Sequence, residues 1–181
     1  TEYINGNKNS FINENKEQIT SLNISGFRNL KHLTISKNYQ EYIKDTTRFI
    51  AHAGGIIDSY VYTNSLEALD YNYSKGFRFF ELDILKTRDD IYVAANDWNL
   101  WSIMTNYTGH LPPSHKEFLD YKIYRKYSSM DIGIINDWFN KHNDAVLITD
   151  KINEPLSFSR NFVDKDRLMM ELFDLDTIII A

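Results

Sequence analysis

The pattern of apolar and polar positions divides the chain into two unequal parts. Residues 1–45 are polar and rich in Asn and Lys, with few positions at core spacing. Beyond them, short apolar runs alternate with amphipathic stretches that are bounded by turn-forming residues. We therefore expect an N-terminal lead-in segment over residues 1–45, with a turn at 23–26 and a short helix near 39–45. A folded α/β domain is expected over residues 46–181.

The expected domain begins with a strand, a helix and a second strand. Residues 48–55 form a short apolar run that ends in two glycines, which predicts a buried strand followed by a turn. Asn64 and Glu67 have the spacing of a helix start, and the helix should extend to Lys75, before a glycine stop. Residues 77–85 predict the second strand. This order, with short connections, indicates a parallel α/β unit.

The remaining segments continue the alternation of strands and helices. The elements are expected as a turn at 88–90, strands at 91–95, 145–149 and 177–181, and helices at 114–122, 131–142 and 164–172. Ser114 suits the cap of its helix. The helix at 131–142 carries apolar residues at core spacing, which indicates one face turned to the sheet. The last strand is expected to be cut off by the end of the chain.

Composition narrows the class of protein. Hydrophobic residues make up 43% of the 181 residues and charged residues 25%, which is typical of a globular domain. The net charge of −5 and the lack of a Lys/Arg cluster argue against a nucleic-acid-binding face. No apolar run approaches the roughly 18 residues of a membrane span. The absence of Cys excludes disulfides but leaves both a cytoplasmic and an exported location open.

Two carboxylates share one face of the strand expected at 77–85. Side chains alternate along a strand, so Glu81 and Asp83 lie on one face. The other face, with Arg78, Phe80, Leu82 and Ile84, is mostly apolar and should pack against helices. Adjacent carboxylates in a partly buried place raise their own pKa values, and a hard cation such as Ca²⁺ or Mg²⁺ removes that cost. In parallel α/β folds, sites lie at the C-terminal ends of strands. The alternative, which spacing leaves open, is a surface Glu and Asp on an edge strand.

His52 stands at the C-terminal end of the first expected strand. The two glycines that follow it let the backbone approach a ligand closely. A histidine at such a point can move a proton near neutral pH. An isolated histidine would be better explained as a hydrogen-bonded core residue, so the interpretation depends on its context.

That context is an ordered series of short motifs. The series is HAGG at 52–55, TNSLEA at 63–68, GFRFFELD at 76–83, TRDD at 87–90 and VAAND at 93–97. Together these motifs resemble the glycerophosphodiester phosphodiesterase family of phospholipase-C-like enzymes, whose pattern is roughly H-R-G, E-N-T-x-x-A, E-x-D, T-x-D-G and H-D. The resemblance covers residues 48–100 well and residues 130–155 loosely.

The resemblance implies a TIM-type (β/α) barrel that hydrolyses a small-molecule phosphodiester of lipid metabolism with the help of a divalent cation, Ca²⁺ or Mg²⁺. By position, His52 matches the first catalytic histidine. Glu81 and Asp83 match metal ligands. Lys151 resembles the lysine that helps to hold the phosphate, and Asn64 is carried over as a substrate-binding candidate. A cation and a lysine would neutralise developing charge, and a histidine would supply protons.

Three features depart from the family pattern. Asn96 replaces the second catalytic histidine, and an amide cannot donate a proton to a leaving alkoxide and recover it. The third metal ligand falls at Thr149, so Asp150 is a metal-ligand candidate only if a bulge turns it inward. From residue 48 the chain offers about half of the ~250 residues of a barrel, so the barrel should be incomplete in this chain.

These departures leave functions of different classes open. The first is a metal-dependent phosphodiester hydrolase whose catalytic site has a natural or engineered change at Asn96, unless His110 or His115 substitutes. The second is a catalytically inactive binding or scaffold protein that keeps the fold. A third is a lyase that releases a cyclic phosphate, as related barrel phospholipases do. The sequence determines neither the substrate head group nor the oligomeric state.

Overall fold

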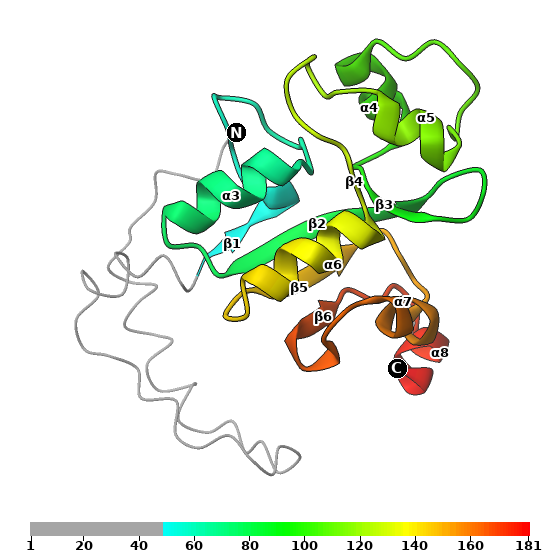
Figure 1. Ribbon diagram of the computed structural model, residues 1–181. Coiled ribbons are helices and arrows are strands. Elements are labelled where there is room, and N and C mark those ends of the chain that lie inside the picture. Colours follow the sequence, from blue (N-terminus) through cyan, green and yellow to red (C-terminus); the bar gives the residue numbers. More distant parts are fainter. Residues whose placement is uncertain (1–48) are drawn as a thin grey trace, which may run out of the picture. The chain divides into compact units, whose positions relative to one another are not determined.

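The computed structural model describes residues 49–181 as a mixed α/β structure with one six-stranded sheet (Figure 1). The expectations for residues 1–48, including the turn at 23–26 and the helix near 39–45, lie outside the described residues. No helix in the described part of the chain is both long and apolar enough to cross a membrane.

The elements follow in chain order. The strands are β1 (Ile50–Ala51), β2 (Phe79–Lys86), β3 (Tyr92–Ala94), β4 (Met130–Asp131), β5 (Val146–Asp150) and β6 (Leu168–Met170). The helices are α3 (Leu66–Ser74), α4 (Trp98–Thr105), α5 (His115–Asp120), α6 (Ile132–Lys141), α7 (Pro155–Asn161) and α8 (Leu175–Ile180), with 3₁₀ turns η3 (His52–Gly54) and η4 (Lys165–Arg167).

Strand β2 is the centre of the sheet and has three neighbours. β5 pairs parallel with it along Phe79–Asp83, and β6 pairs parallel with β5. β1 pairs parallel with only the first two residues of β2, whereas β3 pairs antiparallel with its last three, Ile84–Lys86. Neither β1 nor β3 is a ladder partner of the residues between, Glu81–Asp83. We call this stretch of β2 the fork.

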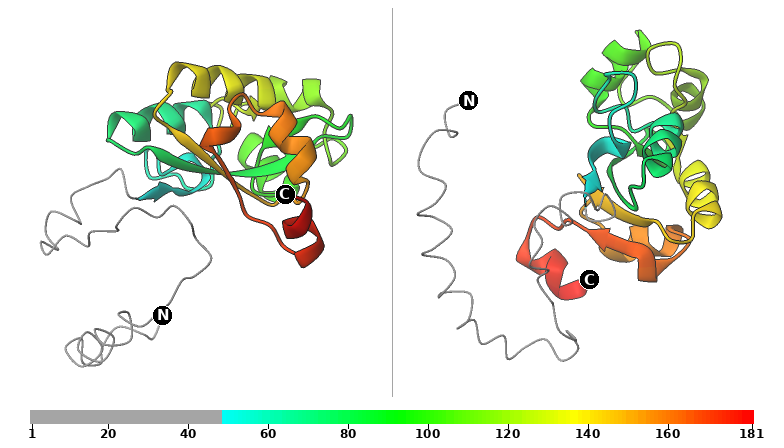
Figure 2. Two further views of the ribbon diagram at one scale, coloured as in Figure 1. Left: turned by 90° about the horizontal axis from the view of Figure 1, so that it is seen from below. Right: turned by 90° about the vertical axis from the view of Figure 1, so that its left-hand side faces the viewer.

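One face of β2 builds the core. Phe80, Leu82 and Ile84 are completely buried and pack against side chains from α3, α6 and α7. Helices α3 and α6 lie on the same face of the sheet (Figures 1 and 2). Burial of each such side chain contributes roughly 1.5–3 kcal/mol. Because side chains alternate along a strand, Glu81 and Asp83 are directed to the opposite face, away from these helices.

Capping side chains set the starts of several helices. Ser114 and Glu117 form the reciprocal capping box at α5, and Asp131 caps α6. The start of α3 differs from the expectation by one residue, because the side chain of Ser65 rather than Asn64 accepts from the backbone N–H of Ala68. Asn64 instead has a left-handed φ of 47° and turns its amide toward β2.

Two predicted strands are shorter in the structure than expected, and the direction of the second was not predicted. The strand expected at 48–55 is paired only over Ile50–Ala51, because the chain then enters η3 with Ala53 at a left-handed φ of 52°. The strand expected at 91–95 exists as β3 but runs antiparallel to β2. A short turn can join only antiparallel neighbours, whereas a parallel return needs a crossover of roughly a dozen residues.

Predictions for the C-terminal region were wrong in type. Residues 164–172 contain η4 and strand β6 instead of a helix. Residues 177–181, expected as a strand, belong largely to helix α8, whose cap is Asp174 accepting from the Thr177 N–H. Helices α4 and α7 were not anticipated, although Asp97 caps the first and a proline at the first turn begins the second.

Candidate functional site

Three acidic side chains converge on the face of the sheet opposite α3 and α6. Asp83 and Asp150 are register partners on β2 and β5, and Glu81 lies two residues before Asp83. Strand alternation therefore places all three on one face. One oxygen from each lies within 4.8 Å of the others. Asp150 thus joins the group as the last residue of a regular strand, and the bulge that the sequence argument required is unnecessary.

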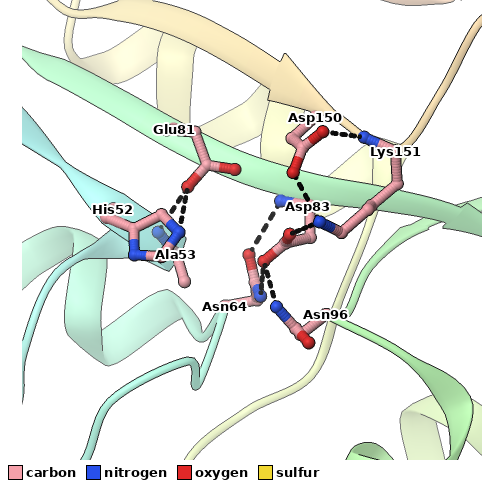
Figure 3. A network of polar contacts seen from close by, with 8 residues as sticks. All are labelled: His52, Ala53, Asn64, Glu81, Asp83, Asn96, Asp150 and Lys151. Atoms are coloured by element: carbon pink, nitrogen blue, oxygen red, sulfur yellow. Dashed lines mark hydrogen bonds and ion pairs between the residues drawn. The ribbon is translucent and has the colours of Figure 1, made fainter. Parts of the chain in front are cut away.

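Glu81 has one bonded and one free oxygen, whereas one oxygen of Asp83 accepts hydrogen bonds and the other has only an ion pair with Lys151 (Figure 3). Glu81 is 5% exposed and Asp83 is completely buried, which removes the surface edge-strand alternative. Glu81 Oε2 accepts from the backbone N–H of Ala53 at 2.7 Å, and Asp83 Oδ2 accepts from Asn64 Nδ2 at 2.9 Å. Glu81 Oε1 and Asp83 Oδ1 are buried without a hydrogen bond. Such oxygens are costly unless a partner satisfies them, and a hard cation is a suitable partner.

The pKa of Glu81 reports the same electrostatic situation. This pKa is raised to about 7, mainly by burial and in smaller part by the charge of Asp83, whereas the Ala53 N–H and His52 oppose the rise. A raised carboxyl pKa was expected from repulsion between the acids. The direction agrees for Glu81, but desolvation by burial contributes more to it than repulsion does.

Lys151 brings a positive charge to the acids. It follows β5 with a left-handed φ of 68°, and this turn brings its side chain back toward the site face. Its Nζ lies 2.6 Å from Asp150 Oδ2 and 3.5 Å from Asp83 Oδ1. Burial by itself would raise the pKa of Asp150, but the hydrogen bonds from Lys151 outweigh it and leave this pKa below its ordinary value. The hydrogen bond to Asp150 in turn raises the pKa of Lys151.

His52 lies at the rim of the site. Its side chain is 60% exposed, and its Nε2 is 3.7 Å from Glu81 Oε2. The ring of Tyr62 meets the imidazole edge-on, with 5.1 Å between ring centroids. An exposed imidazole in this position can exchange protons with solvent and with a ligand. Sequence reasoning missed Tyr62, because the loop between β1 and α3 has no periodic pattern that would indicate which side chain reaches the histidine.

An apolar hollow adjoins the imidazole of His52. It has a volume of about 340 Å³. Its walls include Ile50 of β1, residues Ile56, Val61 and Tyr62 of the following loop, and Phe77, which precedes β2. The rim of the site therefore offers room for an organic group next to a proton-transfer side chain.

Asn96 completes the ring of polar groups around Asp83. It follows β3, and its Nδ2 donates to Asp83 Oδ2 at 3.3 Å. The two histidines considered as substitutes are elsewhere. His115 Nε2 pairs with Asp131 Oδ2 at 2.7 Å, and His110 is an exposed loop residue. Within residues 49–181, neither histidine has a hydrogen bond or ion pair with the three acids.

Comparisons with known proteins identify the fold. No protein-family model matches the chain, and no curated protein matches its sequence. A solved glycerophosphoryl diester phosphodiesterase from Parabacteroides distasonis ATCC 8503 matches 72% of the chain with a TM-score of 0.58 and 20% identity. A glycerophosphodiester phosphodiesterase from Agrobacterium tumefaciens str. C58 matches 71% with a TM-score of 0.55 and 14% identity. The chain shares the fold of glycerophosphodiester phosphodiesterases.

A further glycerophosphodiester phosphodiesterase from Parabacteroides distasonis ATCC 8503 matches 74% of the chain with a TM-score of 0.55 and 18% identity. The three matches cover 48%, 58% and 59% of the solved chains, so this chain spans about half to three fifths of their length. The family resemblance of the motifs is thereby confirmed at the level of the fold. The phosphodiesterase fold is present in part, and a closed barrel is not formed by residues 49–181.

Proposed function

We propose that this chain carries the metal- and phosphate-binding part of a glycerophosphodiester phosphodiesterase site, within a TIM-type barrel of which it forms one portion. The observation that carries the proposal is the pair of buried oxygens without a hydrogen bond, Glu81 Oε1 and Asp83 Oδ1, beside Asp150. They lie toward the C-terminal ends of parallel strands, where barrel enzymes place their chemistry. The shared fold supports the same reaction class.

Each polar side chain has a distinct role in this proposal. Glu81, Asp83 and Asp150 would hold one divalent cation, because three carboxylates offer the hard oxygen ligands that Ca²⁺ and Mg²⁺ take. Such a cation, when bound, supplies charge that stabilises a phosphodiester during attack. Lys151 contributes an ammonium group that can bind a phosphate oxygen. His52, exposed at the rim, transfers a proton between solvent and the reacting group.

Asn96 decides between an enzyme and a binding protein. Its amide can orient a phosphate oxygen or a water molecule, but it has no proton to give to a leaving alkoxide. The acid–base pair implied by the family resemblance is therefore reduced to His52. Loss of one such group typically lowers the rate by about 10²–10⁴-fold. A catalytically inactive protein that binds a phosphodiester through the same cation is thus the second function, and Asn96 is the observation that favours it.

Calorimetric titration of Ca²⁺ or Mg²⁺ tests the cation site. The protein should bind one cation, and Glu81→Ala should remove most of the binding because it deletes a buried ligand. Glu154→Ala is the matched control, since Glu154 is paired with Lys86 away from the three acids. Absence of binding in the unaltered protein, or equal binding after Glu81→Ala, would eliminate the metal site.

Activity measurements then separate the two functions. Asn96→His, placed in the complete protein, restores the missing proton donor and should raise hydrolysis of glycerophosphodiesters by about 10²–10⁴-fold if the site is an enzyme's. Phosphorus NMR of the products distinguishes hydrolysis from release of a cyclic phosphate. Hydrolysis that stays absent across a panel of diesters and metals, while the cation binds normally, would favour the binding protein.

A further inference from the structure

The fork, residues Glu81–Asp83, has no ladder partner on one edge of β2. The pairing of β2 with β1 ends at Phe80, and its pairing with β3 begins at Ile84. A backbone N–H that is buried in this gap needs another acceptor. The Asp83 N–H donates to Asn64 Oδ1 at 3.1 Å. On the same edge the Asp83 carbonyl accepts from the Ala95 N–H, just after β3, at 2.9 Å. The amide side chain of Asn64 therefore supplies the acceptor that a strand would otherwise offer to the Asp83 N–H.

The same amide also holds the carboxylate of Asp83. Asn64 Nδ2 donates to Asp83 Oδ2 at 2.9 Å, so the two ends of one amide bond the backbone and the side chain of one residue. Two contacts of this kind restrict the rotation of the Asp83 side chain. With Oδ2 occupied, Oδ1 is left as the buried oxygen without a hydrogen bond. Asn64 itself is completely buried, which directs its amide to the protein rather than to a ligand.

A backbone contact couples this arrangement to Glu81. The Asn64 N–H donates to the carbonyl of Ala53 at 3.0 Å, and the Ala53 N–H donates to Glu81 Oε2 at 2.7 Å. Ala53 and Asn64 both have left-handed φ values, 52° and 47°. Two turns, each with a conformation that is unusual for a residue other than glycine, thus face each other and hold one acid apiece.

We infer that Asn64 is a positioning residue for the cation site: it orients Asp83 so that Oδ1, which has no hydrogen bond, faces Glu81 and Asp150. The inference rests on the proposed function for the existence of the cation site, and it replaces the substrate-binding role that the family resemblance implied for Asn64. Outer groups that hold metal ligands typically change metal affinity by about 10–100-fold when they are removed. We expect a loss of this size without Asn64.

Asn64→Gly is the cleanest test, because glycine adopts a left-handed φ without strain and the substitution removes only the amide. Calorimetric titration with Ca²⁺ and with Mg²⁺ should show affinity about 10–100-fold below that of the unaltered protein. Thermal unfolding in a chelator establishes that the variant is folded during the titration. Affinity equal to that of the unaltered protein would overturn the inference and show that only the shape of the turn matters.

Asn64→Asp gives an independent answer, also if the glycine variant does not fold. It keeps the volume of the side chain and the acceptor for the Asp83 N–H, but it replaces the donor to Asp83 Oδ2 by a second acceptor. Added negative charge alone predicts tighter cation binding. Loss of positioning predicts weaker binding, because the two carboxylates repel and Asp83 leaves its place. Weaker binding supports the inference, and equal or tighter binding contradicts it.

Asn136→Ala is the matched control. Asn136 also uses both ends of its amide, donating to the Asn161 carbonyl and accepting from the Val163 N–H, but it does so on α6 outside the acidic group. Its loss should lower stability and leave cation affinity unchanged. If the unaltered protein binds no cation, the proposed function fails. If it binds and Asn64→Gly binds equally, only the inference about Asn64 fails.

Discussion

Without the proposed cation, the stability of this protein should depend on pH through Glu81. This side chain is 5% exposed, and burial is the main reason why its pKa is about 7 in the folded protein. In the unfolded chain the same group regains water and its ordinary pKa of 4.5. The folded protein therefore keeps a proton that the unfolded chain has already released over the range between these two values.

The sign and size of the effect follow from this difference. The folded form binds more protons than the unfolded form between the two pKa values, so stability falls as pH rises through that range. The stability that the protonated Glu81 contributes is fully present below pH 4.5 and fully lost above about pH 7. One pH unit corresponds to roughly 1.4 kcal/mol, which makes the total loss about 3 kcal/mol. That is a large share of the ~5–15 kcal/mol that stabilises a typical domain.

Urea unfolding in a chelator, at several pH values between about 5 and 8, measures this loss. Glu81→Gln serves as the reference, because its amide has nearly the same shape as the carboxyl group but does not ionise. The two proteins should be similar near pH 5, and the variant should be about 3 kcal/mol more stable near pH 8. Saturating Ca²⁺ or Mg²⁺ should abolish the decline. Parallel curves for the two proteins in chelator would refute the reasoning.

Three further substitutions have defined outcomes. Gly55→Ala should lower the free energy of unfolding by about 2 kcal/mol or more, because φ is +92° and the new Cβ would lie 2.3 Å from Asn72 Nδ2. An unchanged midpoint of urea unfolding would contradict this prediction. Arg167→Ala should lower the free energy of unfolding by about 2–3 kcal/mol, since the guanidinium donates to three backbone carbonyls near the end of α6. Arg167→Lys should recover part of this stability. Unchanged stability of Arg167→Ala would disprove the stabilising role of Arg167. Lys151→Met removes a positive charge, so it should tighten cation binding about tenfold and weaken the binding of inorganic phosphate, both measured by calorimetry. Changes of both affinities in the same direction would show that the charge of Lys151 is not the cause.

Local patterns were sufficient for the elements that surround the core. The alternation in β2 identified both its buried face and the pair Glu81 and Asp83, and the apolar spacing of α6 identified its packed face. The cap at Ser114 was predicted as well, although the reciprocal contact of Glu117 was not. These signals arise from neighbouring residues, whose period is set by strand or helix geometry. They are readable before any tertiary contact is known.

The C-terminal errors arose where local preference and environment disagree. Three consecutive isoleucines at 178–180 favour a strand by their β-branched shape. In the structure Asp174 caps a helix there instead, and Ile179 is 80% exposed. Likewise, β6 forms because β5 offers a free edge, which no pattern within 164–172 indicates.

The candidate site depends on backbone turns that sequence patterns do not show. Ala53, Asn64 and Lys151 all adopt left-handed φ values although none is a glycine. The turn at Ala53 aims an N–H at Glu81, and the turn at Lys151 returns an ammonium group to Asp150. A residue-by-residue alternation rule cannot anticipate such turns, because they exist only where surrounding contacts outweigh the local steric preference.

Because β2 pairs with three strands, it should tolerate insertions and deletions poorly. Parallel partners hold its first five residues, and an antiparallel partner holds its last three, so the strand cannot slide against one neighbour without breaking its match to another. A one-residue deletion inside β2 would exchange its two faces, turning Glu81 into the helix-packed interior and Leu82 toward the acids. A point substitution in β2 therefore affects one face of the strand, whereas a single-codon insertion or deletion would disturb the core and the site together.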